Sequence, residues 1–599
     1  MHIEAYTSGN NTYIRLAEAV SVVGANGKPI TRKKILLNLG NIKQYDDGQP
    51  DFLQRLRDSF NRGTPLIPEL LPFVDPNPVA TANDRYLEPK NLGYFVLDGF
   101  FDALGISSVL TLYKSRRKVT YDLLGLVKLL VFGRILYPNS KARTFDQQED
   151  YTFSLTGETD RHKIYYTLDE LNHLKTSLLK RLNTVIARNG ERQTDLTYYD
   201  VTNYYFETDY NDPDEVNEAG IVVHRAMRKK GVSKENRKQP LVQMGLLIDR
   251  EGIPISYDLY PGNTLDHSTF QPSLKRYKEG MDLGRIVVVA DRGMINYKNI
   301  LALEDNGYVM SKSIKKCNAE EKNWAIDPQG FSGAEGDDFR VKSRIVSKEL
   351  KDTTGNKVTI EQKQVVYWSR RFYNREVKEN ENFLKMLEEF AADPHRFPIS
   401  RYKGLAKFIE TCQVDRETGE ILDTQAVQLV KEEKVKEYCK YFGYYMIVTS
   451  ELEESEDAII DIYRGLTRIE SCFRTLKSEF RARPIYVRQE DHIEAHFLIC
   501  FLALTIFRLI QREILRVKGL PTTQTFNWEE GLSSERLQRA LKEFASDVQN
   551  DGTFKLTKPT EDLQLTLSAL NVQHPGASCT RSDLVQFKNL LKRKSKAIF

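Results

Sequence analysis

The sequence predicts a multidomain protein of the α/β class. Its 599 residues exceed what one hydrophobic core supports, so several domains are expected. Stretches rich in Val, Ile and Tyr follow one another as three antiparallel strands and then a buried strand, with helix-like stretches between and around them. Hydrophobic residues make up 40% of the chain and charged residues 28%, which is typical of a globular protein and excludes a mainly disordered one.

Two regions precede the predicted sheet. Residues 1–90 hold two strand-like runs and a short helix-like segment, which predicts a small β-containing N-terminal module. Residues 91–190 are mostly helix-like, and the apolar residues of 121–138 recur at helical spacing until Pro138 ends the pattern. This second region is therefore expected to be helical.

The predicted sheet begins near residue 196. Its strands are expected at 196–207, 240–249, 253–262 and 285–293, with short helices at 267–279 and 296–305. A long segment with strands and helices of its own interrupts the pattern, which resumes with a strand and a helix over 456–483 that Pro484 stops. The expected order is a first core part at 191–315, an inserted β-rich α+β domain at 316–440, a second core part at 441–515 and a C-terminal region at 516–599.

Charge and cysteine content set few limits on function. The 87 basic and 83 acidic residues leave a net charge of +4, which does not by itself indicate a nucleic-acid partner. Six cysteines lack paired C-x-x-C spacing, which disfavours a zinc module or a disulfide framework. The N-terminus lacks the pattern of a secretory signal, and the apolar run 496–507 is too short to span a bilayer. A cytoplasmic location without a membrane partner is expected.

Two aspartates stand at unusual places on the predicted strands. Asp200 lies in the middle of "LTYYDVTNYYFETD", a strand built for burial, where an unpaired charge is costly. Asp291 ends the apolar run 286–290, at the edge of the sheet where α/β proteins usually bind ligands. Asp291 could alternatively cap the turn that follows it, a common use of Asp beside Gly.

A third carboxylate lies on the predicted helix 456–483. The apolar residues Ile462, Leu466, Ile469, Phe473, Leu476 and Phe480 form the stripe that packs on the sheet. Beside that stripe Tyr463, Glu470 and Lys477 recur at steps of seven, with Arg474 and Arg481 close by. Glu470 could simply pair with Arg474 on a solvated face. The cations outnumber this glutamate, however, and their row suits phosphates.

These stretches resemble the bacterial insertion-sequence transposases of the DDE type. The resemblance is carried by "YYDVTNYYFE", "VVVADRGM" and "YRGLTRIESCFRTLKSEFRARPIYV" and covers roughly 196–515. The third motif of that family reads Tyr, two residues, Arg, three residues, Glu, six residues, Lys. Tyr463, Glu470 and Lys477 fall on it, whereas Leu466 stands at the arginine position. The role of that arginine would then pass to Arg464 or Arg468.

The resemblance implies an RNase H-like catalytic core interrupted by the inserted domain and flanked by helical regions. Asp200, Asp291 and Glu470 would bind two Mg²⁺ or Mn²⁺ ions, and a freed 3′-hydroxyl would attack a phosphodiester. Reasoning from the residues agrees, because hard cations prefer carboxylate oxygens and neutralise carboxylates that otherwise repel one another. The implied partner is double-stranded DNA, both the terminal inverted repeats and the target, bound by a homodimer.

The residues expected to contact DNA lie in the third motif, in the basic loop 224–240 and in the insert. They are Tyr463, Arg464, Arg468, Arg474, Lys477, Arg481, Arg228, Lys229, Lys230, Lys234, Arg237 and Trp368. Clustered Lys and Arg favour phosphate contact, although such loops are usually only solvated. Trp368 and Trp324 are candidates for stacking on a flipped base, although a tryptophan is more often a core residue. Residues 91–190 are also expected to bind DNA.

Other interpretations remain open at this point. A nuclease or resolvase on the same core would cut without joining, and a silent DNA-binding derivative would not cut at all. His492 and His496 lie one helical turn apart and could bind zinc, but a packing role is favoured because no third ligand is evident. Asp249 and Asp258 are rival carboxylates, and Asp249 opens a turn where Asp is common.

Overall fold

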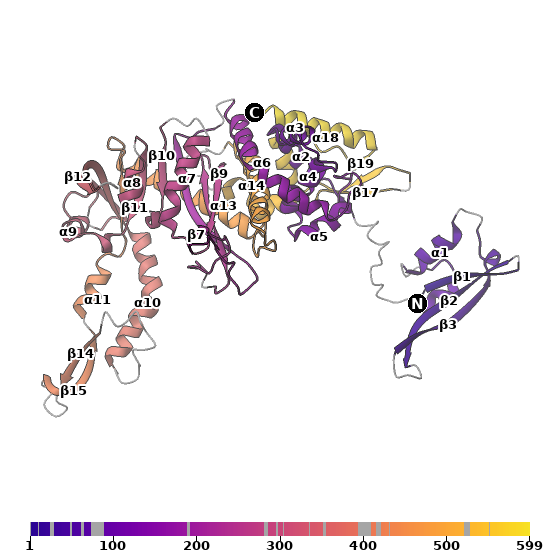
Figure 1. Cartoon of the computed structure of the whole chain (residues 1–599), viewed down its shortest axis with the longest axis horizontal. Coiled ribbons are helices and arrows are strands. Elements are labelled where there is room, and N and C mark those ends of the chain that lie inside the picture. The colour runs from indigo at the N-terminus through magenta and orange to yellow at the C-terminus, as the bar shows by residue number, and fades with distance from the viewer. Residues whose placement is uncertain are drawn as a thin grey trace. The chain divides into compact units, whose positions relative to one another are not determined.

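The protein divides into two compact units, Met1–Lys90 and Asn91–Phe599, in the computed structural model (Figure 1). The described residues are 2–9, 11–23, 29–47, 51–61, 65–73, 89–188, 192–235, 237–280, 285–294, 297–303, 305–334, 336–351, 355–392, 409–414, 421–430, 432–519, 528–549 and 551–599.

The N-terminal unit is a three-stranded antiparallel sheet with one α-helix. Its elements are β1 (His2–Ser8), β2 (Asn11–Val23), β3 (Pro29–Asn41), η1 (Ile42–Gln44), α1 (Phe52–Asn61) and η2 (Pro68–Phe73). Strand β2 pairs with both neighbours. Ile3, Ile14 and Leu16 from the strands and Leu56 from α1 are buried together, so the apolar side of the helix closes one face of the sheet.

The second unit is built on an eight-stranded mixed sheet with the order β12-β13-β16-β11-β10-β5-β8-β9. Its strands are β5 (Leu196–Tyr205), β8 (Leu241–Ile248), β9 (Pro254–Pro261), β10 (Val287–Ala290), β11 (Gly307–Lys312), β12 (Phe339–Lys351), β13 (Lys357–Ser369) and β16 (Tyr444–Thr449). The predicted antiparallel succession of β5, β8 and β9 is confirmed. Strand β10 runs parallel to both β5 and β11, and β16 is antiparallel to β11.

Both faces of this sheet are covered. Alternate residues of β5 point to opposite sides, as the period of a strand requires. Tyr198 and Tyr204 belong to the core cluster on one side, and Tyr199 and Val201 to the cluster on the other. Helix α7 (Asp266–Gly280) contributes Phe270 to the second cluster, and the short α8 (Tyr297–Leu301) follows β10. A mixed α/β architecture with a large sheet and many helices results.

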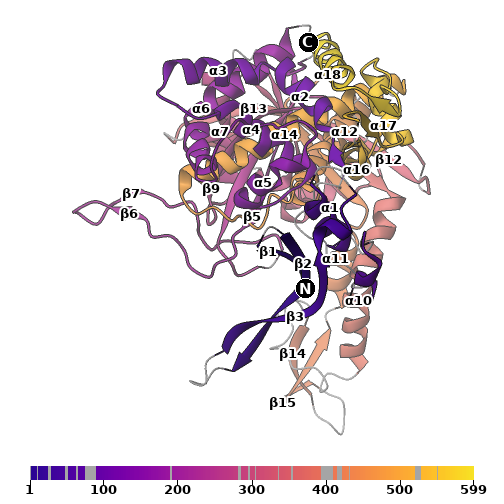
Figure 2. The ribbon, with the colours of Figure 1, turned by 90° about the vertical axis from the view of Figure 1, so that its right-hand side faces the viewer.

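The segment 316–440, expected as an inserted β-rich domain, contributes strands to the main sheet. Its strands β12 and β13 continue the main sheet, because β13 pairs with β16 along Lys363 to Trp368. The remaining elements extend away from the sheet as an arm (Figures 1 and 2). The arm comprises α10 (Arg370–Ala392), β14 (Ile409–Val414), β15 (Ile421–Val430) and α11 (Glu432–Cys439), and η6 (Ile314–Lys316) and α9 (Ala319–Ile326) precede β12. Pairing with β13 covers the edge that β16 would otherwise expose.

Helices from both ends of the second unit share one core with the sheet. They are α2 (Tyr94–Ala103), α3 (Ile106–Arg116), α4 (Leu123–Leu136), α5 (Lys141–Asp146), α6 (Lys163–Ala187), α14 (Glu490–Val517), α15 (Trp528–Gly531), α16 (Ser534–Glu543), α17 (Glu561–Ala569) and α18 (Arg581–Lys596). The smaller elements are β4 (Lys90–Asn91), η4 (Gln147–Asp150), β6 (Glu215–Val216), β7 (Val222–His224), η5 (Arg292–Met294), β17 (Ala545–Val548), β18 (Phe554–Leu556) and β19 (Ser578–Cys579). Phe95 of α2 and Phe587 of α18 are in ring contact, so the expected regions 91–190 and 516–599 pack together.

Helix α14 is longer than its apolar run suggested. Its 28 residues would suffice by length and composition to cross a membrane, as would two bent pairs, Tyr94–Ala103 with Ile106–Arg116 and Leu123–Leu136 with Lys141–Asp150. The expectation that the run is too short to span a bilayer is therefore wrong on length. The most apolar window of α14 is 94% buried inside the protein, and the helix also carries the buried Arg508 and Arg512.

The helix predicted over 456–483 is broken into α12 (Glu456–Arg464) and α13 (Thr467–Lys477). Gly465 lies at the break, where a Cβ atom would collide with the hydroxyl group of Tyr198 from β5. Only glycine therefore allows the chain to approach the sheet this closely. The second helix ends at Lys477 rather than before Pro484, and Arg481 takes a left-handed backbone conformation with φ of 45°.

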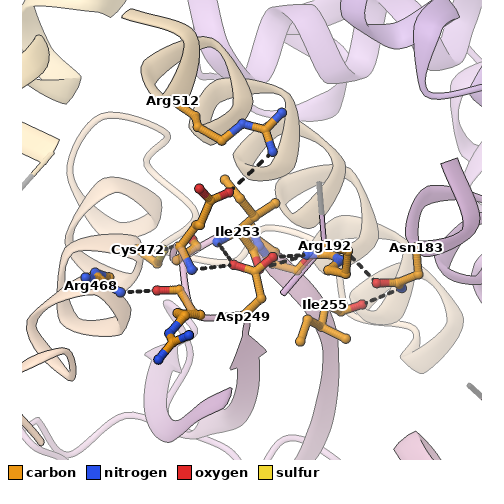
Figure 3. A network of polar contacts seen from close by, with 12 residues as sticks. Asn183, Arg192, Asp249, Ile253, Ile255, Arg468, Cys472 and Arg512 are labelled. Carbon is orange, nitrogen blue, oxygen red and sulfur yellow. Dashed lines mark hydrogen bonds and ion pairs between the residues drawn. The ribbon is translucent and has the colours of Figure 1, made fainter. Parts of the chain in front are cut away.

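The turn between β8 and β9 is buried and held by arginines (Figure 3). The carboxylate of Asp249 accepts a hydrogen bond from Arg192 at 2.8 Å and others from the backbone N–H groups of Glu251 and Ile253. Two further arginines reach the same turn. Arg468 on α13 donates to the carbonyl oxygen of Arg250, and Arg512 on α14 lies 3.5 Å from Glu251. We call this network the turn clamp. The turn clamp accounts for the buried carboxylate of Asp249 by a structural role in holding this turn.

Replacing Asp249 by Asn tests the turn clamp. The change leaves the buried Arg192 without its carboxylate, and we expect a loss of about 3–5 kcal/mol in the free energy of unfolding. Denaturant unfolding monitored by tryptophan fluorescence measures the loss. The control is Asp195→Asn, because that carboxylate is 60% exposed and pairs with Arg250 at 3.0 Å, and we expect it to cost less than about 1 kcal/mol. Equal losses in the two variants would contradict the clamp.

Candidate active site

The structure brings the three predicted carboxylates to one cavity. The parallel pairing of β10 with β5 runs Val287 to Leu196 and Val289 to Tyr198, and two further residues in that register place Asp291 level with Asp200. Adjacent strands lie about 4.8 Å apart, so the two aspartates are close neighbours. With Glu470 from α13 they line a cavity of about 600 Å³.

The rest of this cavity is lined by cationic and aromatic side chains and by two further carboxylates, Glu376 and Glu379. The cations are Lys312, Lys315, Arg375 and Arg464, and the aromatic residues are Tyr367, Phe372, Tyr441, Tyr444, Tyr445 and Tyr463. The rings of Tyr367 and Tyr445 are stacked with centroids 5.7 Å apart. Cations next to partly accessible aromatic rings suit a polyanion that carries flat bases.

Asp291 is held by its neighbours on both sides. Its Oδ1 accepts hydrogen bonds from the hydroxyl groups of Ser311 on β11 at 3.2 Å and of Tyr463 on α12 at 3.3 Å. Burial, and then the charge of Asp291, raise the pKa of Tyr463 well above its ordinary value. Tyr463 therefore stays protonated at neutral pH and remains a hydrogen-bond donor to the carboxylate.

Asp200 is the most perturbed of the three carboxylates. Its pKa is raised to about 6, mainly by burial and also by the charges of Asp291 and Asp266, against the opposing effects of Lys234 and of the hydrogen bond from the backbone N–H of Val201. Lys234 from the basic loop donates to the carbonyl oxygen of Val201 at 2.5 Å and lies 3.7 Å from Asp266. Sequence reasoning missed Asp266. The available signal was an acidic residue opening the helix that follows β9.

Glu470 has electrostatic surroundings similar to those of Asp200. Burial, and then Asp291, raise the pKa of Glu470, whereas Arg474 and Lys234 lower it. The guanidinium group of Arg474 forms its ion pair with Glu529 at 2.9 Å. The alternative in which Glu470 and Arg474 form a simple surface pair is therefore not what the structure shows.

The carboxylate trio is suited to a divalent cation by its chemistry. Two of its members have raised pKa values, which shows that their negative charge is poorly compensated by the protein. Hard cations prefer such oxygen ligands. Among the described residues, no three His, Cys, Asp or Glu side chains are grouped tightly enough to hold an ion as they stand. The trio thus shares a cavity without forming a preassembled cluster.

Lys477 lies above β5 beside the cavity. Its Nζ donates to the hydroxyl group of Thr202 at 2.7 Å and lies 3.7 Å from Glu235. Burial, and then the charge of Lys234, lower the pKa of Lys477 to about 8. Thr202 is two residues from Asp200 on the same strand, so this ammonium group stands next to the carboxylates.

Two predicted DNA contacts face away from the cavity. Arg468 is 1% exposed and belongs to the turn clamp. Trp368 is buried, and its Nε1–H donates to the carbonyl oxygen of Phe442 at 3.2 Å. Arg468 precedes Glu470 by two residues, which is about 200° around a helix, and so it points into the core. Trp324 is half-buried beside Arg344.

The basic loop is partly neutralised by its own carboxylates. Arg228 pairs with Asp212, and Lys229 lies 2.6 Å from Asp214. Arg237 stacks over the ring of Tyr205 at 3.9 Å. The remaining predicted contacts are exposed: Lys230, Arg464 and Arg481. The hairpin that contains β6 and β7 projects from the sheet before this loop (Figure 2).

The two histidines one turn apart have separate partners. His492 lies 2.9 Å from Asp169, and His496 is buried between Lys141 and the carbonyl oxygen of Ala482. This arrangement supports packing rather than zinc binding for the pair. The rival carboxylate Asp258 pairs with Arg276 at 2.9 Å.

Comparison with known families identifies the domain that carries this cavity. A family model described as "Transposase DDE domain" matches residues 216–378 and 382–506. The chain contains a transposase DDE domain. The matched residues include Asp291 and Glu470 and begin beyond Asp200, so the first strand of the sheet lies outside the match.

Similar solved structures are complexes of one transposase, and each covers only part of this chain. The Mos1 transposase paired-end complex with left transposon end is 11% identical, covers 30% of this chain and 55% of its own, and has a TM-score of 0.13. The Mos1 mariner paired-end complex with Mn has the same identity and TM-score, and 56% of that chain is covered. This chain thus spans about half the length of those proteins. No match was found among curated proteins.

The raised pKa of Asp200 predicts a stability that depends on pH. A carboxyl group whose pKa rises from 3.8 to about 6 on folding destabilises the fold when it is ionised. The loss in the free energy of unfolding is therefore fully present above pH 6 and absent below about pH 4. We expect Asp200→Asn to stabilise the metal-free protein at pH 8 by about 1–3 kcal/mol and to have little effect at pH 4.

Thermal unfolding in the presence of a chelator measures this effect. The control is Asp209→Asn, an exposed aspartate beyond the end of the same strand, which should change neither profile. A stabilisation by Asp200→Asn that is equal at both pH values would show that the carboxylate is not strained by its surroundings.

Proposed function

We propose that this protein is an insertion-sequence transposase that cuts transposon ends and joins the freed 3′-hydroxyl group to target DNA. One observation carries the proposal. Carboxylates from β5, β10 and α13 line a single cavity with cationic and aromatic walls, in a chain that contains a transposase DDE domain. DNA strand cleavage and joining is the chemistry that this combination fits best.

An RNase H-like core is part of the proposal. The order β9-β8-β5-β10-β11 supports it, with three consecutive antiparallel strands and then two strands parallel to the first. The insertion would then be the segment between β11 and β16, of which β12 and β13 join the sheet. The N-terminal unit 1–90 and the helices of 91–190 would help to recognise the transposon end.

Asp200, Asp291 and Glu470 would hold two divalent cations, Mg²⁺ or Mn²⁺. When bound, such ions stabilise the attacking and the leaving oxygen of an in-line displacement. The chain itself orients the carboxylates. Ser311 and Tyr463 fix Asp291 by hydrogen bonds, and the carboxyl group of Asp200 must release a proton that it holds below about pH 6.

Double-stranded DNA is the proposed partner, as terminal inverted repeats and as target. Lys234, Arg464 and Lys477 border the cavity and would neutralise backbone phosphates. The half-buried rings of Tyr444 and Tyr445 in the cavity would contact a base, whereas Tyr367 and Trp368 are buried. A homodimer on DNA would bring one such site to each transposon end.

The first experiment replaces each carboxylate in turn. Asp200→Ala, Asp291→Ala and Glu470→Ala should each abolish Mg²⁺-dependent cleavage of a duplex that carries the transposon end, because each removes a cation ligand, while duplex binding survives. Gel assays of nicking and of strand transfer with a 3′-hydroxyl donor measure the two steps. Asp209→Ala is the control and should retain both. Cleavage without joining by the wild-type protein would instead indicate a nuclease or resolvase.

A second experiment addresses Lys477. Lys477→Ala should weaken binding of the end duplex and reduce the slope of log affinity against log salt concentration by about 1, because one phosphate contact is lost. Fluorescence anisotropy over a salt series gives the slope. Arg539→Ala, an exposed arginine that pairs with Glu535, is the control. An unchanged slope for Lys477→Ala would place this residue off the DNA.

A further inference from the structure

A second cavity, of about 440 Å³, lies between helices α4, α5 and α14 and the chain that follows α13. Four cations line it, Arg134, Lys141, Arg481 and Arg483, together with His496 and Tyr486. None of its lining residues is acidic in the part of the chain that the structure describes. A cavity with this lining attracts anions.

Lys141 is the decisive group in this cavity. Its side chain is 4% exposed, and its Nζ lies 3.2 Å from Nδ1 of His496. The Nε2–H of His496 donates to the carbonyl oxygen of Ala482 at 2.9 Å, which leaves Nδ1 as the acceptor for Lys141. Within the described residues Lys141 has no acidic partner, and a buried ammonium group without a counter-ion is costly.

Several groups set the charge state of Lys141. Burial, and then Arg134, lower its pKa well below the ordinary value, and Cys500 acts weakly in the opposite direction. Burial, and then Lys141 and Arg134, likewise lower the pKa of His496. The outer cations are Arg481, which is exposed, and Arg483, which pairs with Glu235. Without an anion, burial and the charge of Arg134 thus disfavour the charged form of Lys141.

Arg134 gives the cavity a fixed wall. Its guanidinium group is 5% exposed and donates to the carbonyl oxygens of Phe480, Arg481 and Asn139 at 3.1, 3.3 and 3.1 Å. Its Nε–H has no hydrogen-bond partner. The end of α4 is thereby tied to the segment that follows α13, so the cationic groups are positioned before any ligand arrives.

A chain of contacts links this cavity to the candidate active site. Arg483 pairs with Glu235, which lies 3.7 Å from Lys477, and Lys477 donates to Thr202 on β5. The N–H of Ile485 also donates to Tyr205 at the end of β5. Five residues of strand separate Tyr205 from Asp200, which is about 16 Å. A spacing of this size corresponds to about five base-pair steps along the helix axis of B-DNA.

We propose that this cavity binds a phosphate group, and that in the working protein the phosphate belongs to the DNA backbone several nucleotides from the bond that is cut. The DNA part rests on the proposed function. Tyr486 is 62% exposed at the cavity, where its ring can stack on a base or sugar beside the bound phosphate. Binding draws a proton onto Nζ of Lys141, which then forms an ion pair with a phosphate oxygen.

The test compares the full-length protein with Lys141→Met, which keeps the length of the side chain and removes the amine. The probes are a short duplex of arbitrary sequence, because phosphate contacts do not depend on sequence, and inorganic phosphate. Calorimetry at pH 8 in two buffers of different ionisation enthalpy counts the protons taken up. Wild-type protein should take up a proton on binding the duplex, and Lys141→Met should not.

Affinity over a salt series provides the second measurement. Lys141→Met should bind the duplex about tenfold more weakly, with a salt slope lower by about 1. Lys558→Met removes an exposed lysine from the C-terminal region and should change neither quantity. Arg481→Gln is an exposed position that leaves folding intact, so it tests the cavity even if Lys141→Met does not fold. It should lower the slope while proton uptake remains.

The outcomes separate the sources of phosphate. Wild-type-like slope and proton uptake in Lys141→Met overturn the inference. Proton-linked binding of inorganic phosphate that Lys141→Met loses, with unchanged duplex affinity, supports a phosphate site and overturns its assignment to DNA. Failure of the proposed function appears differently, as absent Mg²⁺-dependent cleavage by the wild-type protein, and it leaves these binding measurements unaffected.

Discussion

The turn clamp is the constraint on which the rest of the site depends. Buried arginines from three parts of the chain meet at the turn between β8 and β9, and one of them, Arg468, belongs to the same helix as Glu470. Because Arg468 is anchored below the helix, Glu470 is held at the cavity that it shares with Asp200, in the middle of β5, and Asp291, just after β10. An ion network that lies outside the cavity therefore sets the position of one carboxylate relative to the other two.

The sequence predicted the sheet well because short-range patterns encode it. The alternation in 196–207 and the unbroken apolar run 286–290 correctly indicated strands, and their pairing makes Asp200 and Asp291 neighbours. The helix break at Gly465 was not predictable, since it depends on close packing against Tyr198 of β5. The inward direction of Arg468 and the burial of Trp368 likewise arise from partners distant in the sequence. The shared cavity of the trio is now described, whereas its catalytic role stays a prediction.

Two cavities of opposite character lie along the same stretch of chain. The first gathers carboxylates whose pKa values are raised, and the second gathers cations with no acidic residue in its described lining. Each is electrostatically unfavourable when empty, and under the proposals made above a metal ion would stabilise the first and a phosphate group the second. The buried charges thus lower the stability of the empty protein and favour binding of a ligand, as is usual where function requires charge in a protein interior.

The pairing of β12 and β13 with the main sheet limits which parts of the segment 316–440 can be changed. They hydrogen-bond into the main sheet through β16, so excising the whole segment 316–440 would strip a long edge and invite aggregation. The arm of α10, β14, β15 and α11 is joined to that platform without adding a strand to it. Evolution or an engineer can therefore lengthen, shorten or exchange the outer part of the arm, provided that the two supporting strands are kept together with the start of α10, whose Phe372 and Arg375 line the first cavity.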